Sequence, residues 1–242
     1  MVSEDSLKRS FLAVVLGAAA AFAAGAEPAR ATNECRGLQV CVRVAGPWVV
    51  VPTRTGVPRP QVEFQLSCPR RYLVGGLDAE VSDAAVDVTF LGKLGSPVNP
   101  GITTSRSAVF VATYAGRAAR VPTFRPHIGC VPSAGGGGGP VPYRAGAAAA
   151  PRPTVRRVTT VHVQPGRRQT AVRPCAAGER LVRGADAVGF YTSRAPAPAL
   201  ASTVHARLRL GADRVTASVR STGAVRGIRA VVQVAAVCGG GR

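Results

Sequence analysis

The sequence predicts an all-β protein, built as two tandem disulfide-closed β-sandwich (Ig-like) domains behind a signal peptide. Apolar and polar residues alternate with a period of two along most of the chain, which is typical of strands with one buried face. Glycine (28 residues) and proline (19) are frequent enough to separate short strands by turns. The hydrophobic content of 46% excludes a disordered chain, and the absence of a G-x-y repeat excludes collagen.

Residues 1–31 have the composition of a signal peptide. Two basic residues precede an apolar stretch from Phe11 to Ala26, which is shorter than the roughly 20 residues that span a bilayer. Small residues allow cleavage after Ala26 or after Ala31. We therefore expect the mature chain to be extracellular or associated with the cell envelope, with no transmembrane segment.

A short motif occurs twice, as Leu73–Ala79 (LVGGLDA) and as Leu181–Ala187 (LVRGADA). Five of the seven positions are identical, and each copy follows a cysteine. Gly76 precedes Cys130 and Gly184 precedes Cys238 by the same 54 residues. Motif and cysteines therefore agree in register, which indicates two copies of one domain. The predicted parts are a first domain over 32–133, a Gly/Pro/Ala-rich linker over 134–157 and a second domain over 158–242.

The six cysteines are expected to form disulfides, because an even number in an exported chain is typical of such bonds. Six cysteines allow 15 pairings, and the repeat selects among them. The predicted pairs are Cys68–Cys130, Cys175–Cys238 and Cys35–Cys41. Each long loop would stabilise its domain by about 4 kcal/mol on the chain-entropy account. A Cys/His metal site lacks any C-x-x-C spacing, so neither a metal nor a cofactor is predicted.

Alternation places strands in both copies and assigns their inward faces. The expected strands are 62–68, 86–90, 108–114 and one ending at Cys130 in the first copy, and 158–163, 204–210, 214–220 and 228–238 in the second. Trp48, the only tryptophan, is expected to pack at a strand start rather than to bind a ligand.

The recurring glycines and aspartates of the motif receive a structural interpretation. Gly76 and Gly184 are expected to satisfy a backbone need, either a β-bulge or a positive φ. Asp78 and Asp186 occupy equivalent places, and their recurrence favours capping of a turn by accepting backbone N–H bonds over catalysis.

No catalytic residue is predicted, and the protein is not expected to be an enzyme. The G-x-S-x-G nucleophile motif is absent, and few acidic residues are available for a paired-carboxylate mechanism. His127, His162 and His205 lie on different expected strands and are assigned to the surface, although a three-histidine metal site is the alternative.

The strongest functional signal is a concentration of positive charge in the second copy. The chain has a formal net charge of +19, and residues 158–242 contain 13 arginines against three acidic residues. Arg207 and Arg209 alternate with apolar residues, as do Arg214 and Arg220 on the following strand. If these strands are neighbours, the four arginines form one anion-binding surface. Arginine suits phosphate and carboxylate groups, so we expect a secreted non-enzymatic protein that binds an anionic polymer, polysaccharide or surface at the cell envelope.

Two alternatives remain open for this basic surface. One is a solvated arginine-rich surface that reflects only GC-rich codon usage, and the other is a structural or protein-interaction module of the cell exterior. Nucleic acid as a dedicated ligand is disfavoured, because the second copy has only Phe190 and Tyr191 as stacking residues and no helix-turn-helix or zinc finger. The oligomeric state is not predicted.

Part of the chain also resembles a known group of proteins. Cys68-Pro69 followed by Leu73–Gly76, the loop Leu94–Pro97 and the stretch Phe124–Pro132 are similar to secreted actinobacterial proteins with Cys-Pro…Gly-Gly β-domains. The resemblance covers about residues 60–132 and, more faintly, 158–238, where Ala176 replaces the proline and Arg183 the first glycine. It implies export and β structure, and it assigns no activity and no functional residue.

Overall fold

The structure is a computed structural model that describes residues 32–53, 58–91, 106–116, 121–133 and 154–240. Residues 1–31, the expected signal peptide, lie outside the described residues. Strands make up 60% of the structure and helices 4%, so the predicted all-β fold class is confirmed. The strands are β1 (Val42–Ala45), β2 (Trp48–Val50), β3 (Gln61–Ser67), β4 (Tyr72–Val81), β5 (Val86–Leu91), β6 (Ser107–Tyr114), β7 (Thr123–Pro132), β8 (Val155–His162), β9 (Arg168–Pro174), β10 (Arg180–Tyr191), β11 (Val204–Leu210), β12 (Arg214–Ser221) and β13 (Arg229–Gly239).

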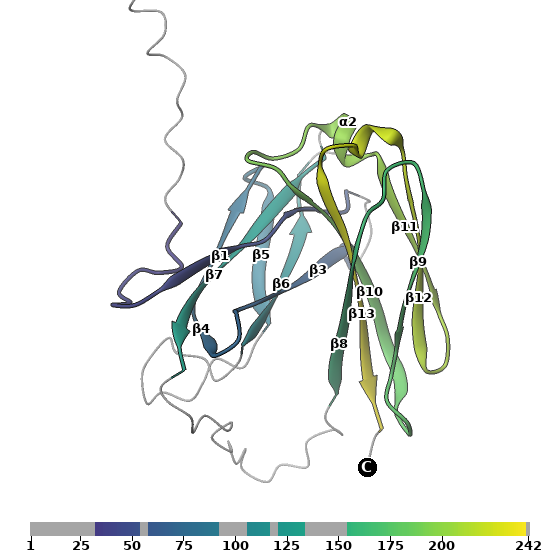
Figure 1. Cartoon of the computed structure of the whole chain (residues 1–242), viewed down its shortest axis with the longest axis horizontal. Coiled ribbons are helices and arrows are strands. Elements are labelled where there is room, and N and C mark those ends of the chain that lie inside the picture. The colour runs from purple at the N-terminus through teal and green to yellow at the C-terminus, as the bar shows by residue number, and fades with distance from the viewer. Residues whose placement is uncertain (1–31, 54–57, 92–105, 117–120, 134–153, 241–242) are drawn as a thin grey trace, which may run out of the picture. The chain divides into compact units, whose positions relative to one another are not determined.

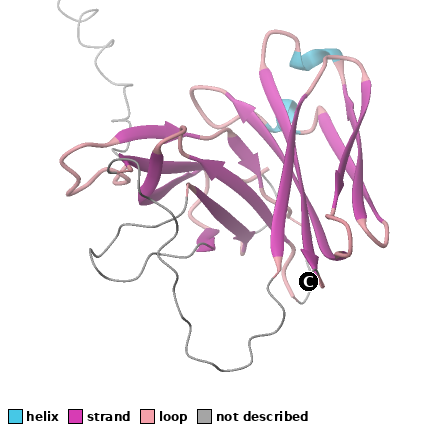
Figure 2. Cartoon of the chain, turned by 60° about the horizontal axis from the view of Figure 1, so that its bottom comes forward, coloured by secondary structure: helices cyan, strands magenta, loops and turns pink. Residues whose placement is uncertain are grey.

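Three antiparallel sheets contain these strands (Figure 1). A seven-stranded sheet has the order β1-β7-β2-β10-β13-β8, with β4 also paired to β7. The two three-stranded sheets have the orders β3-β6-β5 and β11-β12-β9. Two short helical turns, α2 (Pro198–Ala201) and a 3-10 turn at Gly223–Val225, are the helical elements of the described residues (Figure 2).

The N-terminal half (32–133) and the C-terminal half (154–240) have the same pairing pattern. In the first, the last strand β7 pairs with β4 and with β1 and β2, and β6 lies between β3 and β5. In the second, the last strand β13 pairs with β10 and β8, and β12 lies between β9 and β11. Each half has its own cluster of buried apolar side chains, one around Phe110 and Phe124 and the other around Phe190 and Val219.

The two halves are also joined directly. Strand β2 pairs with β10 through Trp48 opposite Phe190 and Val49 opposite Gly189, so one sheet crosses from the first half to the second. Trp48 begins β2 and is buried, as the sequence predicted. Residues 134–153 of the predicted linker lie outside the described residues, and β8 begins at Val155, inside the predicted linker range.

All three predicted disulfides are present: Cys35–Cys41, Cys68–Cys130 and Cys175–Cys238, each with a Cα–Cα distance of 5.7 Å. The two long-range bonds connect the strand end after β3 to β7 and the strand end after β9 to β13, which are equivalent places in the two halves. Cys130 and Cys238 are fully buried, so these bonds belong to the two cores.

The repeated glycines lie inside strands β4 and β10, not in turns, which corrects the predicted turn role. A β-bulge interrupts each strand directly after the residue that lies opposite a cysteine. In β4 it follows Val74, opposite Cys130, and in β10 it follows Leu181, opposite Cys238. Neither Gly76 nor Gly184 has a positive φ. Gly76 is required by close approach, because a Cβ there would lie 1.8 Å from the backbone oxygen of Glu34.

The two equivalent aspartates likewise lie within strands and differ from each other. Asp78 accepts backbone N–H bonds from Asn33 (2.6 Å) and from Ala79 (2.8 Å). The bond from Asn33 holds residues 32–41, here named the N-terminal segment, against β4. Asp186 is half-buried on β10, and its partial burial raises the pKa of its carboxyl. The predicted acceptance of backbone N–H bonds is thus found for Asp78, in a strand rather than a turn, because the N-terminal segment packs on β4.

Candidate anion-binding face

The sheet β11-β12-β9 has one side in the core and one side in solvent. Strand β12 shows this most clearly, because Val215, Ala217 and Val219 are completely buried while Arg214 and Arg220 are exposed. The strands that the sequence treated as neighbours, β11 and β12, pair along their whole length. We call the outward side the basic face; its basic residues without an ion pair in the described part of the chain are Arg168, His205, Arg207, Arg209 and Arg220, whereas Arg214 at its margin is paired with Asp213.

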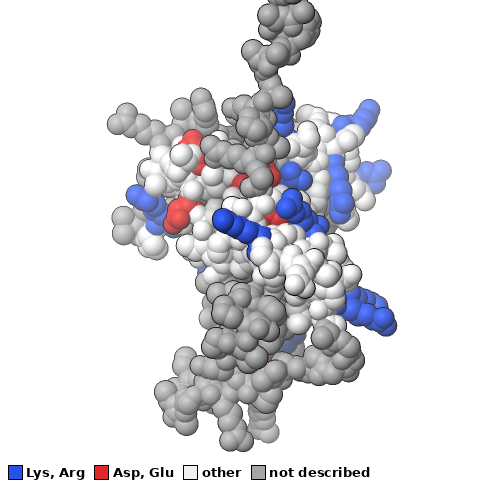
Figure 3. Space-filling model, turned by 90° about the vertical axis from the view of Figure 1, so that its left-hand side faces the viewer, with Lys and Arg blue, Asp and Glu red and all other residues white. Residues whose placement is uncertain are grey.

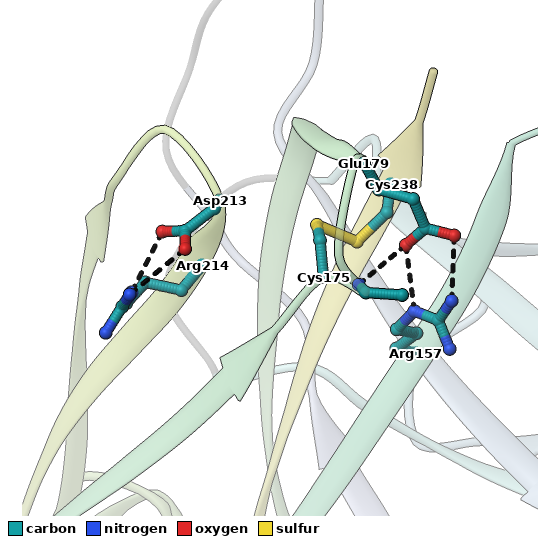
Figure 4. Close-up of a disulfide and its surroundings, with 7 residues drawn as sticks. Arg157, Cys175, Glu179, Asp213, Arg214 and Cys238 are labelled. Carbon is teal, nitrogen blue, oxygen red and sulfur yellow. Dashed lines mark hydrogen bonds and ion pairs between the residues drawn. A yellow bond between two sulfur atoms is a disulfide. The ribbon is translucent and has the colours of Figure 1, made fainter. Parts of the chain in front are cut away.

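The four predicted arginines do not have the same surroundings. Arg207, Arg209 and Arg220 are exposed and form no ion pair within the described residues. Arg214 instead makes a two-pronged pair with the adjacent Asp213, at 2.9 and 3.0 Å (Figure 4). This hydrogen bonding lowers the pKa of Asp213 and raises that of Arg214, so the charge of Arg214 is already matched.

Two further basic residues of the face, Arg168 and His205, were not among the predicted anion-binding residues. Arg168 opens β9, a strand that the alternation analysis missed, and His205 opens the outward series of β11. The repeat contained a signal for β9, because β3 ends one residue before Cys68 and β9 ends one residue before the equivalent Cys175.

Three basic residues of the face lie side by side on adjacent strands. Arg220 on β12 faces His205 on β11 and Arg168 on β9, so the three side chains form a row across the sheet, here named the cross-strand row. Directly opposite residues have Cβ atoms about 4.5–5.5 Å apart, and like charges in such positions are destabilising. All three residues are exposed, and no acidic residue occupies an outward position on β9, β11 or β12. A bound anion would relieve this repulsion.

The neighbouring positions on the basic face are hydroxyl-bearing. Ser218 lies opposite Arg207 on one side and Thr170 on the other, and Thr216 lies opposite Arg209. Arg207 and Arg209 continue from His205 along β11 at alternate positions, which sets them about 6.8 Å apart. The face therefore combines spaced positive charges with neutral hydrogen-bond donors.

The corresponding sheet of the N-terminal half, β3-β6-β5, has a different outward side. Glu63 and Gln65 on β3 point outward by alternation, yet Glu63 is only 2% exposed. Its carboxylate pairs with Arg156 of β8 and with Arg183 of β10, whose Nη1 lies 2.6 Å from Oε1. This outward side is thus buried against the C-terminal half, whereas the basic face has no neighbour within the described residues.

The side of the molecule that Figure 3 presents has acidic and basic side chains close together. A buried group of this kind is formed by His127 on β7, which is 6% exposed, with Nε2 3.1 Å from a carboxylate oxygen of Glu80 and Nδ1 3.9 Å from one of Glu34. The surface position expected for His127 was therefore wrong, because the N-terminal segment covers it. Burial lowers the pKa of His127, and the two carboxylates oppose that effect.

Other features of the described residues offer less chemistry. The one group of three potential metal ligands is Cys175, Glu179 and Cys238, in which the two sulfur atoms are bonded to each other (Figure 4). A shallow hollow of about 230 Å³ has Ser82 and Asp83 as its polar residues and is otherwise lined by proline, alanine and valine. Neither helical turn of the described residues is long and apolar enough to cross a membrane.

Comparison of the chain with protein-family models, curated protein sequences and solved structures gave no match.

Proposed function

We propose that this protein is secreted, has no enzymatic activity, and binds an anionic polymer or surface at the cell envelope through the basic face. The single observation that supports this most is the cross-strand row, in which exposed Arg220 lies opposite exposed Arg168 on one side and exposed His205 on the other, without an acidic residue on the outward side of these strands. Surface charge that serves only solubility is normally interspersed with the opposite sign. The signal-like residues 1–31 and the three disulfides support export.

We further propose that the two halves are copies of one ancestral domain. The repeated motif, the equivalent disulfides and the matching pairing patterns support this duplication. After the duplication, the outward side of the three-stranded sheet acquired Glu63 in one half, where it contacts protein, and arginines in the other. This difference supports a binding role for the second half.

The test uses the whole mature chain, because the halves share a sheet. Its binding to anionic polymers is measured by biolayer interferometry at several salt concentrations. We expect affinity to fall steeply with added salt and to be lost in the double variant Arg207→Glu/Arg209→Glu. The charge-matched control is the double variant Arg59→Glu/Arg70→Glu, at two exposed positions of the N-terminal half. Equal loss in both variants, or binding that ignores salt, would refute the proposal.

A protein-interaction module is the second candidate. It is favoured by one observation, that the equivalent outward side in the N-terminal half is covered by protein. This candidate function predicts that a protein partner is recovered in a pull-down with the whole chain. It also predicts that Arg207→Glu/Arg209→Glu leaves the amount of recovered partner unchanged.

A further inference from the structure

We propose that the ligand of the basic face is a linear phosphate polymer, and that the cross-strand row binds one of its phosphate groups. This inference rests on the proposed function and specifies its ligand class. It concerns which anion the face prefers among phosphate, sulfate and carboxylate.

The donors of the cross-strand row exceed what a carboxylate accepts. Arg168 and Arg220 each present a planar fork of five N–H donors, and His205 adds a ring donor beside them. A carboxylate offers two oxygens and a single charge. A phosphate group offers more acceptor oxygens and, where it is a monoester or chain end, close to two charges. Two arginines and a histidine donor on adjacent strands therefore match the larger number of phosphate oxygens better than the two oxygens of a carboxylate.

The next positions along the strands extend the same chemistry. Thr170 and Ser218 lie two residues from Arg168 and Arg220 on the same side of the sheet, with Ser218 between Thr170 and Arg207. Hydroxyls and guanidinium groups together are common donors to phosphate oxygens. Arg207 and Arg209 then lie at strand-set intervals of about 6.8 Å along β11. A polymer with one charge on every unit can contact the row and both of these arginines at once.

Among the described residues of the basic face, Val172 on β9 is the exposed large apolar side chain, and this low apolar content favours a polymer over a lipid surface. Peripheral membrane binding normally uses apolar side chains together with basic ones. The outward positions of β11 and β12 between the cations are filled by Ser218 and Thr216 rather than by large apolar residues. We therefore assign the phosphate to a soluble or wall-bound chain and treat phospholipid headgroups as an outcome of the test.

The experiment compares three polymers of similar length at equal charge concentration, namely inorganic polyphosphate, dextran sulfate and polygalacturonate, and adds phosphatidylglycerol vesicles. We expect polyphosphate to bind about tenfold more tightly than polygalacturonate, which corresponds to about one additional charge-assisted hydrogen bond. Dextran sulfate should be intermediate, and vesicles should not compete.

Matched variants locate the site on the face. Arg220→Gln should weaken polyphosphate binding about tenfold, because Arg220 is the centre of the row. Arg214→Gln removes the same charge from the same strand, but Arg214 is paired with Asp213, so its affinity should change less than twofold. Melting temperatures of both variants verify that they are folded.

The possible results separate the two proposals. Equal or tighter binding of polygalacturonate or dextran sulfate, or capture by the vesicles, would overturn the phosphate assignment and leave the anion-binding function intact. Equal effects of Arg220→Gln and Arg214→Gln on a folded protein would overturn the assignment to the row. Failure of every anionic probe to bind at low salt would overturn both proposals.

Discussion

The side-chain amide of Gln233 on β13 binds both backbone groups of Gln65 on β3. Its Nε2 donates to the carbonyl oxygen of Gln65 at 3.0 Å, and its Oε1 accepts the N–H of Gln65 at 2.6 Å. Strand β3 is at the edge of its sheet, so these backbone groups have no strand partner. One side chain of the C-terminal half thus completes the hydrogen bonding of a strand edge in the N-terminal half.

Gln233→Leu should lower the free energy of unfolding by about 2 kcal/mol, because it leaves a buried N–H and a buried carbonyl without partners. Urea denaturation followed by tryptophan fluorescence measures this, since Trp48 lies at the junction of the halves. The control is Gln39→Leu at an exposed position, which should change stability by less than about 0.5 kcal/mol. A Gln233→Leu protein as stable as the parent would contradict the bridging role.

Glu63→Gln should destabilise the protein more, by about 3–5 kcal/mol, because it leaves Arg156 and Arg183 beside a neutral side chain. Burial lowers the pKa of Arg156 and Glu63 opposes this, so the pair depends on the carboxylate charge. The comparison variant is Asp87→Asn, which removes an exposed carboxylate of the same half. Equal melting temperatures for the two variants would show that the buried pair does not hold the halves together.

Gly76→Ala and Gly184→Ala form a matched pair at equivalent positions of the repeat. The first directs a Cβ at the backbone oxygen of Glu34, which cannot move without displacing the N-terminal segment. The second directs it at Leu210 Cδ2 (2.5 Å) and Val215 Cγ2 (2.8 Å), of which the exposed leucine can move. We expect losses of about 3 and about 1 kcal/mol respectively in thermal unfolding. Gly223→Ala, with open space around it, serves as the neutral control.

Asp186→Asn should stabilise the protein at neutral pH. Burial raises the pKa of Asp186 in the folded state, so folding favours its protonated form. The resulting stability is present below the unfolded value of 3.8 and is lost as pH rises through the folded pKa. The variant should therefore melt at a higher temperature than the parent at pH 7 and at the same temperature near pH 3. A lower melting temperature at pH 7 would contradict this account.

Local chemistry in the sequence predicted all three disulfides and the positions of the strands β3, β5, β6, β7, β8, β11, β12 and β13, but it missed β9. The alternation of Val215, Ala217 and Val219 with exposed residues placed β12 correctly, and the pairing of β11 with β12 followed from their adjacency. The equal cysteine spacing in the two copies selected the bonds Cys68–Cys130 and Cys175–Cys238. These features depend on contacts within one half, which a local pattern can encode.

Contacts between the halves could not be predicted in the same way. Glu63, Gln65 and His127 occupy outward positions, which the alternation assigned to solvent, and another part of the chain buries them. One signal was available: the run Ala230–Cys238 is almost wholly apolar, which is typical of a strand covered on both sides. The row of Arg168, Arg220 and His205 required the register of three strands, which depends on the whole sheet.

The pairing of Trp48 with Phe190 has a consequence for how the chain is made. Strand β2 is the second strand in chain order, and its partner β10 is synthesised only after the whole N-terminal half. During synthesis the N-terminal half therefore leaves Glu63, Gln65 and one edge of β2 exposed. They are covered only when the C-terminal half has been made. Sequence-distant pairing of this kind slows folding and prolongs the exposure of unpaired edges to aggregation. We therefore expect a holding chaperone to limit aggregation of this chain until its C-terminal strands have been synthesised.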